Sequence, residues 1–284
     1  MSTVGREYGR FVDVEGAPAS MWDGHVATLY RSEREYGASR AAWIRRGFDR
    51  GEKVVLTRIP GEPEDRVLEL CTDAGVDPTQ ARPAQLVSLP PEQFYPPRGQ
   101  EELITQALAE GFSGVRLSAH ASIALNIMSE SDYLAAEQAM DRHCRSGTVS
   151  VMCAYFRTPP TEHPLRITLA THSEGVRAVG FSSSRGANGV RLVGEVDLVT
   201  TDLLAAALDM AVATSAGPHT LVLDLSTLDF IDVAGSRMLL RATDDFRAAG
   251  GELVLDRIQR PVARALRLLD VDRAPGVQLV EDRP

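Results

Sequence analysis

Residues 220–236 read Thr-Leu-Val-Leu-Asp-Leu-Ser-Thr-Leu-Asp-Phe-Ile-Asp-Val-Ala-Gly-Ser, and this stretch decides the fold of the second half of the chain. The apolar run from Thr220 to Leu225 is typical of a buried strand. The segment from Ala234 to Ala249 has apolar residues at helical spacing and ends before two glycines. Asp232 lies between them, at a position where a carboxylate caps the first turn of a helix. The stretch therefore predicts a strand, a loop and a helix of an α/β fold.

The elements on either side extend this pattern through the second half of the chain. Strands are predicted at 176–184 and 189–196, separated by a glycine-containing turn. A helix is predicted from Thr200 to Ala213, with leucine and alanine along one face. Beyond the central helix we predict a strand from Glu252 to Asp256 and a last helix that opens at Pro261.

The first half alternates between strand and helix signals. Strand-like runs occupy residues 25–30, 53–59, 84–89, 115–118 and 148–156, and helical spacing occurs at 40–50, 64–74, 101–110 and 132–145. Strands that alternate with helices imply parallel βαβ units and a layered α/β sheet. We place the domain boundary at Gly175, which gives a flexible leader at 1–22, a first domain at 23–175 and a second at 176–284.

The composition narrows the classes of function. The 284 residues carry a formal net charge of −9 and both halves are acidic, which argues against binding to nucleic acid phosphates. No apolar stretch approaches the roughly 20 residues of a membrane span, and the N-terminus has no signal-peptide core. The three cysteines form no Cys-x-x-Cys pair, so we expect free thiols in a cytoplasmic protein with no metal and no cofactor.

The second half resembles a known family in two motifs. Leu192–Thr200 and Leu221–Ser236 look like the core of a STAS domain, the sulfate transporter and anti-sigma factor antagonist family. The resemblance covers Val176 to Pro284. It implies a mixed sheet with helices on one face, and a binding module whose usual partner is a kinase-type anti-sigma factor. It also implies that the partner contacts a short run at the helix start, namely Asp232, Val233, Ala234, Gly235 and Ser236.

This sequence departs from the STAS pattern at the residue that a partner kinase usually phosphorylates. The family commonly has serine or threonine after the aspartate, but here the residue is Val233, which has no hydroxyl. We therefore expect no phosphorylation at this position. Ser236 is the nearest hydroxyl, and two interpretations stay open for it: a small residue of the first helical turn, or a relocated phosphorylation site. For Asp232 we weigh a helix cap against an interface residue, and both can hold.

The first half contains five further motifs in order, at His25–Tyr30, Gly47–Val55, Gly111–Leu117, Val151–Tyr155 and Ala170–His172. Together they resemble the MEDS family, a sensory domain named from methanogens and methylotrophs. The resemblance spans Gly24 to Val176. It implies a domain similar in architecture to RecA-like ATPase cores, and it implies a small organic ligand of apolar character.

Five residues near predicted strand ends are candidates for contact with that ligand: His25, Tyr30, Arg116, Tyr155 and His172. Ligands of open α/β sheets bind outside the carboxyl ends of the strands. The alternative for each of them is ordinary packing in the core or, for the histidines, a hydrogen-bonded core residue. A metal site formed by His25, His172 and Cys153 is a further alternative that no spacing supports. Glu137, within the helix predicted at 132–145, is interpreted as solvated or ion-paired rather than catalytic.

The RecA-like architecture raises the alternative of a nucleotide hydrolase. A phosphate-binding loop would fall at Ser32–Ser39, but Ser32 replaces its first glycine and Ala38 its lysine. Without that lysine the β- and γ-phosphates lose their cation, and Glu33 and Glu35 would repel them. We therefore expect no hydrolysis of ATP, and there is no Gly-x-Ser-x-Gly nucleophile motif either.

These observations lead to one interpretation and its alternatives. We expect an α/β protein with a RecA-like parallel-sheet N-terminal domain and a smaller STAS α/β C-terminal domain. It would be a regulator rather than an enzyme: a ligand-sensing domain controls a STAS domain that binds an anti-sigma factor, affecting transcription. One alternative is an enzyme that acts on a small molecule through a degenerate RecA-like domain, with the STAS domain as a tether. Another is an adaptor in a large STAS assembly.

Overall fold

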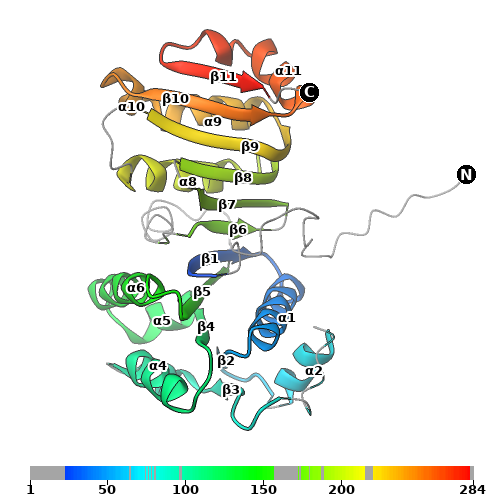
Figure 1. The fold of residues 1–284 in the computed structure, drawn as a ribbon, viewed down its shortest axis with the longest axis vertical. Helices are drawn as coiled ribbons and strands as arrows, with labels where there is room; N and C mark the ends of the chain where they lie inside the picture. The colour runs from blue at the N-terminus through cyan, green and yellow to red at the C-terminus, as the bar shows by residue number, and fades with distance from the viewer. Residues whose placement is uncertain are drawn as a thin grey trace, which may run out of the picture.

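The computed structural model describes residues 23–281, apart from positions 64, 74, 76, 78, 80, 96–97, 157–171, 173, 179, 187–188 and 215–219. The leader predicted at 1–22 lies outside the described residues. Within the described part, eleven strands form one continuous sheet in the order β11-β10-β9-β8-β7-β6-β1-β5-β4-β2-β3. Figure 1 shows this sheet running along the long axis of the molecule. The α/β class predicted from the sequence is confirmed.

The first half of the sheet is parallel and lies between two layers of helices. Its strands are β1 (His25–Tyr30), β2 (Lys53–Thr57), β3 (Leu86–Leu89), β4 (Val115–His120) and β5 (Val149–Phe156). One face is covered by α1 (Glu33–Asp49) and α2 (Arg66–Asp73), and the other by α4 (Gly99–Ala109), α5 (Ala121–Ile127) and α6 (Glu130–Cys144) (Figure 1). The short α3 (Pro91–Phe94) adds Phe94 to the core on this second face.

Alternation along the strands divides the apolar core of this half in two. Val26 and Met152 pack with Trp43 and Ile44 beneath α1. Their neighbours along the strands point to the opposite face, where Ala27 and Cys153 join the core beneath α4–α6. β1 and β5 are buried along nearly their whole length, as expected for a parallel sheet with helices on both faces.

The second half continues the same sheet with helices on one face. Its strands are β6 (Val176–Ala178), β7 (Phe181–Gly186), β8 (Gly189–Val196), β9 (Thr220–Ile231), β10 (Glu252–Ile258) and β11 (Val277–Glu281). The helices are α8 (Thr201–Thr214), α9 (Val233–Ala242), α10 (Asp244–Ala248) and α11 (Arg260–Leu268), followed by the short 3₁₀ helix η3 (Val271–Arg273). β7 is antiparallel to β6 and β8, whereas β8 to β11 are mutually parallel.

Several boundaries differ from the sequence prediction, and three of the differences have a local cause. The strand predicted at 176–184 is divided into β6 and β7, because the chain turns at Gly180 with φ +82°. The helix predicted at 234–249 is divided at Thr243, whose hydroxyl donates to the Leu239 carbonyl at 2.8 Å. Helix α1 begins at Glu33 rather than Arg40, because Ser32 caps it.

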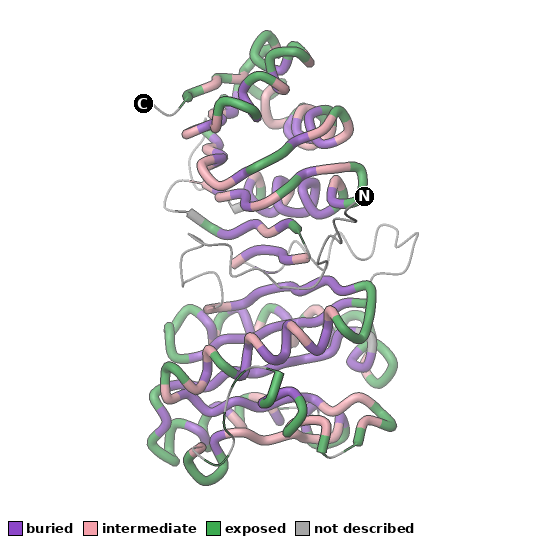
Figure 2. Tube along the Cα trace, turned by 90° about the vertical axis from the view of Figure 1, so that its right-hand side faces the viewer, coloured by how far each residue is buried: buried purple, intermediate pink, exposed green. Residues whose placement is uncertain are grey.

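The junction between the two halves is a strand rather than a flexible linker. β6 pairs in parallel with β1, with Ala27 opposite Val176, and antiparallel with β7. Gly175 immediately precedes it with φ +111°, and a Cβ there would lie 2.0 Å from the Ser183 carbonyl oxygen. Buried residues run through the strands on both sides of this junction (Figure 2). The boundary predicted at 175/176 falls at the first residue of β6.

No helix among the described residues has both the length and the apolar character needed to cross a membrane.

Candidate functional site

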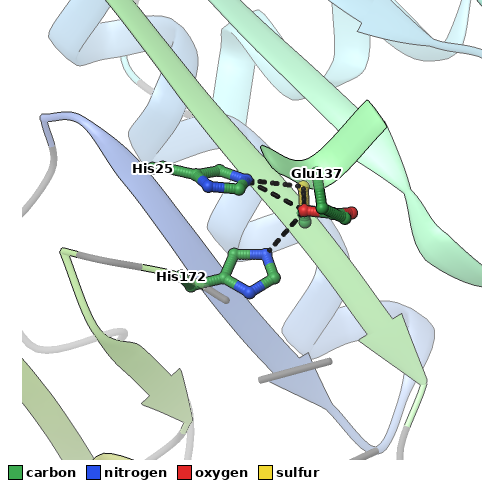
Figure 3. A group of neighbouring side chains, drawn as sticks. His25, Glu137 and His172 are labelled. Atoms are coloured by element: carbon green, nitrogen blue, oxygen red, sulfur yellow. Dashed lines mark hydrogen bonds and ion pairs between the residues drawn. The ribbon is translucent and has the colours of Figure 1, made fainter. Parts of the chain in front are cut away.

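Four buried side chains from four different elements converge beside the junction. His25 comes from β1, Glu137 from α6, Cys153 from β5 and His172 from the segment that leads into β6. His25 and Cys153 point to the same face because alternate residues of parallel neighbours share a face, and Ala27 is opposite Cys153. Figure 3 shows both histidine rings directed at the Glu137 carboxylate. We call these four residues the His–Glu–Cys cluster.

The distances within the His–Glu–Cys cluster are short. Glu137 Oε2 lies 3.0 Å from His25 Nε2 and 3.3 Å from His172 Nε2. Cys153 Sγ lies 3.6 Å from both His25 Nε2 and Glu137 Oε2. Each residue contributes one atom able to bind a metal, and these four atoms all lie within 4.8 Å of one another. Two imidazoles, a carboxylate and a thiol therefore share one small, buried space.

A second layer of polar groups surrounds the cluster. Asp141, one helical turn beyond Glu137 on α6, places Oδ1 3.7 Å from His25 Nδ1. The Tyr155 hydroxyl lies 3.5 Å from His172 Nε2 and forms a 2.8 Å hydrogen bond with the Tyr133 hydroxyl.

The environment changes the protonation of these groups. Burial alone would raise the pKa of Glu137, but the adjacent imidazoles of His172 and His25 outweigh it and hold the pKa to about 2. Burial lowers the pKa of His25, yet Asp141 and Glu137 reverse the sign and raise it overall. Burial, followed by the Glu137 charge, raises the pKa of the Cys153 thiol well above its usual value. Glu137 is therefore a carboxylate that is ion-paired with histidine, and the neighbouring Cys153 is a neutral thiol.

A small cavity of about 20 Å³ adjoins the cluster between β4, β5 and the helices α3–α6. Glu137 and Cys153 belong to its wall, and the other lining residues are mostly apolar: Phe94, Tyr95, Gln100, Leu117, Ala119, Ala121, Ala124, Met128, Tyr133, Ala136, Met140 and Val151. A cavity of this volume holds a molecule of one or two heavy atoms, since about 10–15 Å³ suffices for a water.

The helix start at 232–236 has a different character, because it faces outward. Asp232 caps α9: its Oδ1 accepts the Gly235 N–H at 2.7 Å, and its Oδ2 accepts the Leu198 N–H at 3.0 Å. This one side chain therefore connects the β9–α9 loop to the β8–α8 loop. Of the two interpretations weighed for Asp232, the structure realises the cap, and the residue is still partly exposed.

The five predicted partner contacts divide by exposure. Val233 is exposed and Ala234 half-buried, whereas Gly235 is buried and Ser236 is only 1% exposed. The Ser236 hydroxyl is thus out of reach of a kinase in this conformation, which opposes its interpretation as a relocated phosphorylation site. Four exposed apolar side chains that the sequence analysis did not single out as a group gather around the loop. We call them the apolar patch: Leu198, Val199, Phe230 and Val233.

Comparison with known proteins assigns both halves to families. Residues 24–173 match the family model for MEDS, the MEthanogen/methylotroph, DcmR Sensory domain, and this match covers more than half of the chain. The chain belongs to the MEDS family. Residues 184–282 match the STAS domain, so a MEDS domain is followed by a STAS domain in the order that the sequence indicates. No curated protein matches the chain.

Two solved structures are among those similar to parts of the chain. One is the anti-sigma factor antagonist SpoIIAA in its unphosphorylated form, with 20% identity, a TM-score of 0.28, and coverage of 35% of this chain and 86% of the other. The second is the RadB recombinase, with 14% identity, a TM-score of 0.36, and coverage of 61% and 87%. The predicted α/β class is confirmed, with a parallel sheet in the MEDS domain and a smaller STAS domain after it.

The MEDS domain brings together only three of the five predicted ligand contacts. His25, Tyr155 and His172 meet in or beside the His–Glu–Cys cluster. Tyr30 lies elsewhere, hydrogen-bonded to His120 and stacked on Tyr36. None of the five lines the cavity described above.

Arg116 is engaged at a different place in the MEDS domain. Its guanidinium lies over Trp43 and donates to Glu52 and Asp23, each at 2.6 Å. Arg116 and His25 lie near strand ends, as predicted, but at the amino ends of β4 and β1, whereas ligands of open α/β sheets bind outside the carboxyl ends. The stacking and ion pairs give Arg116 a structural role in this conformation.

Glu137 is the residue that the sequence analysis undervalued. Of its two predicted states, solvated or ion-paired, the structure has the ion pair. The spacing of the sequence could have indicated its burial. Glu137 shares one face of the predicted helix with three apolar residues, and that face is buried in the structure: Tyr133, Met140 and Cys144. A carboxylate within an apolar stripe needs a partner, which two histidines supply here.

The site of the expected phosphate loop is closed by the chain itself. Only Arg31 and Ser32 separate β1 from α1, which leaves no glycine-rich loop. Ser32 Oγ accepts the Glu35 N–H at 3.2 Å, and the Glu35 carboxylate accepts the Arg31 N–H at 2.7 Å. A carboxylate therefore occupies the helix start where a nucleotide hydrolase would hold phosphate.

Proposed function

We propose that this protein is a signalling regulator in which the MEDS domain binds a small apolar molecule and thereby controls a STAS domain that binds a kinase-type anti-sigma factor, affecting transcription. One observation carries the proposal: the sheet is continuous from the His–Glu–Cys cluster to the STAS domain. A change at the cluster would act on the sheet that the two domains share, because packed and hydrogen-bonded elements carry energetic coupling between sites.

The backbone around the junction supports this coupling. Glu174 N–H donates to the His25 carbonyl at 3.1 Å, and Ala27 N–H donates to the Gly175 carbonyl at 3.0 Å. Val176 N–H then donates to Ser183 Oγ on β7 at 3.1 Å. Helix α8, which follows the loop with Leu198 and Val199, packs on β6, β7 and β8. A displacement of His25 would thus reach the apolar patch through β6 and then α8.

The apolar patch supports a protein partner for the STAS domain. Exposed apolar side chains gathered at one loop pair are typical of an interaction surface. The patch surrounds the Asp232 loop, where the STAS resemblance implies contact with an anti-sigma factor. The alternative of a nucleotide hydrolase has less support, because the helix start at Ser32 is already occupied by Glu35.

The partner is tested by a binding assay between the full chain and kinase-type anti-sigma factors of the same organism. Leu198→Asp and Val233→Asp should each weaken binding at least tenfold, because they place an unpaired charge at an apolar contact. Leu268→Asp is the matched control, since Leu268 and Leu198 are each 75% exposed and Leu268 lies on α11. Added ATP should change neither the affinity nor the intact mass, because Val233 has no hydroxyl. Wild-type affinity in both patch variants would overturn the assignment.

The ligand is tested by thermal shift of the full chain against small alcohols, halides and thiols. A ligand at 100 times its dissociation constant stabilises the folded state by roughly 2.7 kcal/mol. Ala124→Val should abolish the shift by filling the cavity, whereas Ala41→Val, at a buried position of α1 on the opposite face of the sheet, should retain it. Equal shifts in both variants would rule out the cavity as the binding site.

A further inference from the structure

We propose that the His–Glu–Cys cluster is a site for a zinc-type divalent metal ion. The ligand atoms would be His25 Nε2, Glu137 Oε2, Cys153 Sγ and His172 Nε2. This inference stands on the geometry of the cluster and does not rest on the proposed function. It takes up the metal site of His25, His172 and Cys153 that the sequence left as an alternative, adds Glu137 to it, and departs from the expectation of no metal.

The distances between these atoms are those of a tetrahedral zinc site. With Zn–N of about 2.0–2.1 Å and Zn–S of about 2.3 Å, tetrahedral geometry gives edges of about 3.3 Å between nitrogen and oxygen and about 3.6 Å to sulfur. The corresponding edges here are 3.0 and 3.3 Å from Glu137 to the two histidines, and 3.6 Å from Cys153 to His25 and to Glu137. The remaining two separations, from His172, are at most 4.8 Å, so a shift of roughly 1 Å in that ring completes the tetrahedron.

The donor set selects the class of metal. Nitrogen and sulfur donors suit zinc and its neighbours, whereas calcium and magnesium take oxygen ligands. The charge also balances, because a thiolate and a carboxylate neutralise a divalent cation in a space where all four residues are buried. Metal binding would release to solvent the thiol proton of Cys153 and the protons that His25 Nε2 and His172 Nε2 direct at Glu137, leaving neutral imidazoles as ligands. The S–H bond is replaced by an S–metal bond with no change of oxidation state.

A carboxylate faces the other ring nitrogen of His25. A metal-bound histidine usually directs that nitrogen at a carboxylate or carbonyl, which fixes the ring. Asp141 Oδ1 lies 3.7 Å from His25 Nδ1, longer than a hydrogen bond, and Arg145 donates to Asp141 Oδ2 at 2.9 Å. Asp141 is therefore placed to accept from His25 Nδ1 after a shift of less than about 1 Å, while Glu137 on the same helix would bind the metal.

The position of the site gives the metal a structural consequence. Its four ligands would join β1, β5 and α6 to His172, which is four residues before β6. The metal would therefore fasten the entry to the STAS domain onto the MEDS sheet. It would also border the small cavity through Glu137 and Cys153.

The test is titration of the reduced, chelator-stripped full chain with Co²⁺ alone, followed by competition with Zn²⁺. We expect one Co²⁺ per chain, visible absorption of tetrahedral intensity and a near-ultraviolet thiolate-to-cobalt charge-transfer band, all removed by Zn²⁺. Cys153→Ser should abolish the charge-transfer band, and Cys153→Ser and Glu137→Gln should each weaken binding at least about tenfold. Cys71→Ser, a buried thiol beneath the opposite helix layer, is the matched control and should match wild type.

Two results would overturn the proposal. The first is folded wild-type protein that takes up no stoichiometric Co²⁺, which would leave the cluster a hydrogen-bonded group only. The second is a charge-transfer band that survives in Cys153→Ser or disappears in Cys71→Ser, which would assign the metal to another thiol. If circular dichroism shows that Cys153→Ser does not fold, the wild-type and Cys71→Ser spectra decide the question.

Discussion

His120 is a buried histidine whose ionisation the fold suppresses. Its ring is hydrogen-bonded to the Tyr30 hydroxyl, and its backbone N–H donates to the Tyr95 hydroxyl at 2.8 Å. Burial, with the charge of Arg40 as a second cause, lowers its pKa to about 4. In the unfolded chain a histidine binds its proton near pH 6.5. Between pH 6.5 and 4 the unfolded state therefore binds more protons, and the free energy of unfolding falls as the pH falls.

His120→Gln should remove this contribution, because glutamine keeps a polar group near Tyr30 and does not titrate. We expect the wild type to lose up to roughly 3 kcal/mol more than the variant between pH 6.5 and 4. Urea unfolding at several pH values measures both curves. A difference between wild type and variant that is independent of pH would contradict the assignment.

Residue types predicted part of the candidate site, but not how its members combine. His25, Tyr155 and His172 were single candidates, and the structure joins them through Glu137. Sequence spacing could not supply this, because Glu137 and His25 lie on different elements more than 100 positions apart. Arg116 was predicted to be a ligand contact because its two carboxylate partners, Asp23 and Glu52, are also distant in the sequence and could not be recognised from spacing.

At the scale of elements, the close approach of the start of β6 to β7 depends on the absence of a side chain at Gly175. The residue has φ +111°, and a Cβ would lie 2.0 Å from the Ser183 carbonyl oxygen. Gly250 also has a positive φ, +92°, but a Cβ there would meet nothing within 4 Å. An alanine at either position would be strained by the positive φ, but only at Gly175 would it also meet the backbone of a neighbouring strand.

Gly175→Ala should cost about 1–3 kcal/mol more than Gly250→Ala in free energy of unfolding, because only the former forces two strands apart. Urea denaturation of the full chain compares the two variants with wild type. Equal losses would show that the β6–β7 approach is not tight in solution.

The sequence predicted helices and strands well where the interactions that begin or end them join residues close together in the chain. Asp232 followed by a helix is one case, since the cap forms within four residues. The division of the last long helix at Thr243 was missed, because it depends on a side-chain hydroxyl bonding back to Leu239 rather than on a glycine or proline. The division between β6 and β7 was missed because strand propensity continues on both sides of Gly180.

At the scale of the whole molecule, one sheet passes through both domains. The family resemblances predicted two domains in the correct order, and residues 24–173 and 184–282 match them. They did not predict that β6 pairs with β1 on one edge and β7 on the other. Such pairing joins residues about 150 positions apart, and no local pattern encodes it.

The central claim is that the state of the His–Glu–Cys cluster is transmitted through this sheet to the STAS surface. The direct measurement is the affinity of the kinase-type anti-sigma factor for wild type and for Glu137→Gln, which removes the cluster's carboxylate charge and retains its shape. Glu102→Gln, on the exposed face of α4, is the control and should bind as wild type does. We predict at least a fivefold change in Kd for Glu137→Gln, the lower end of allosteric coupling. A folded Glu137→Gln protein with the wild-type Kd would contradict the account.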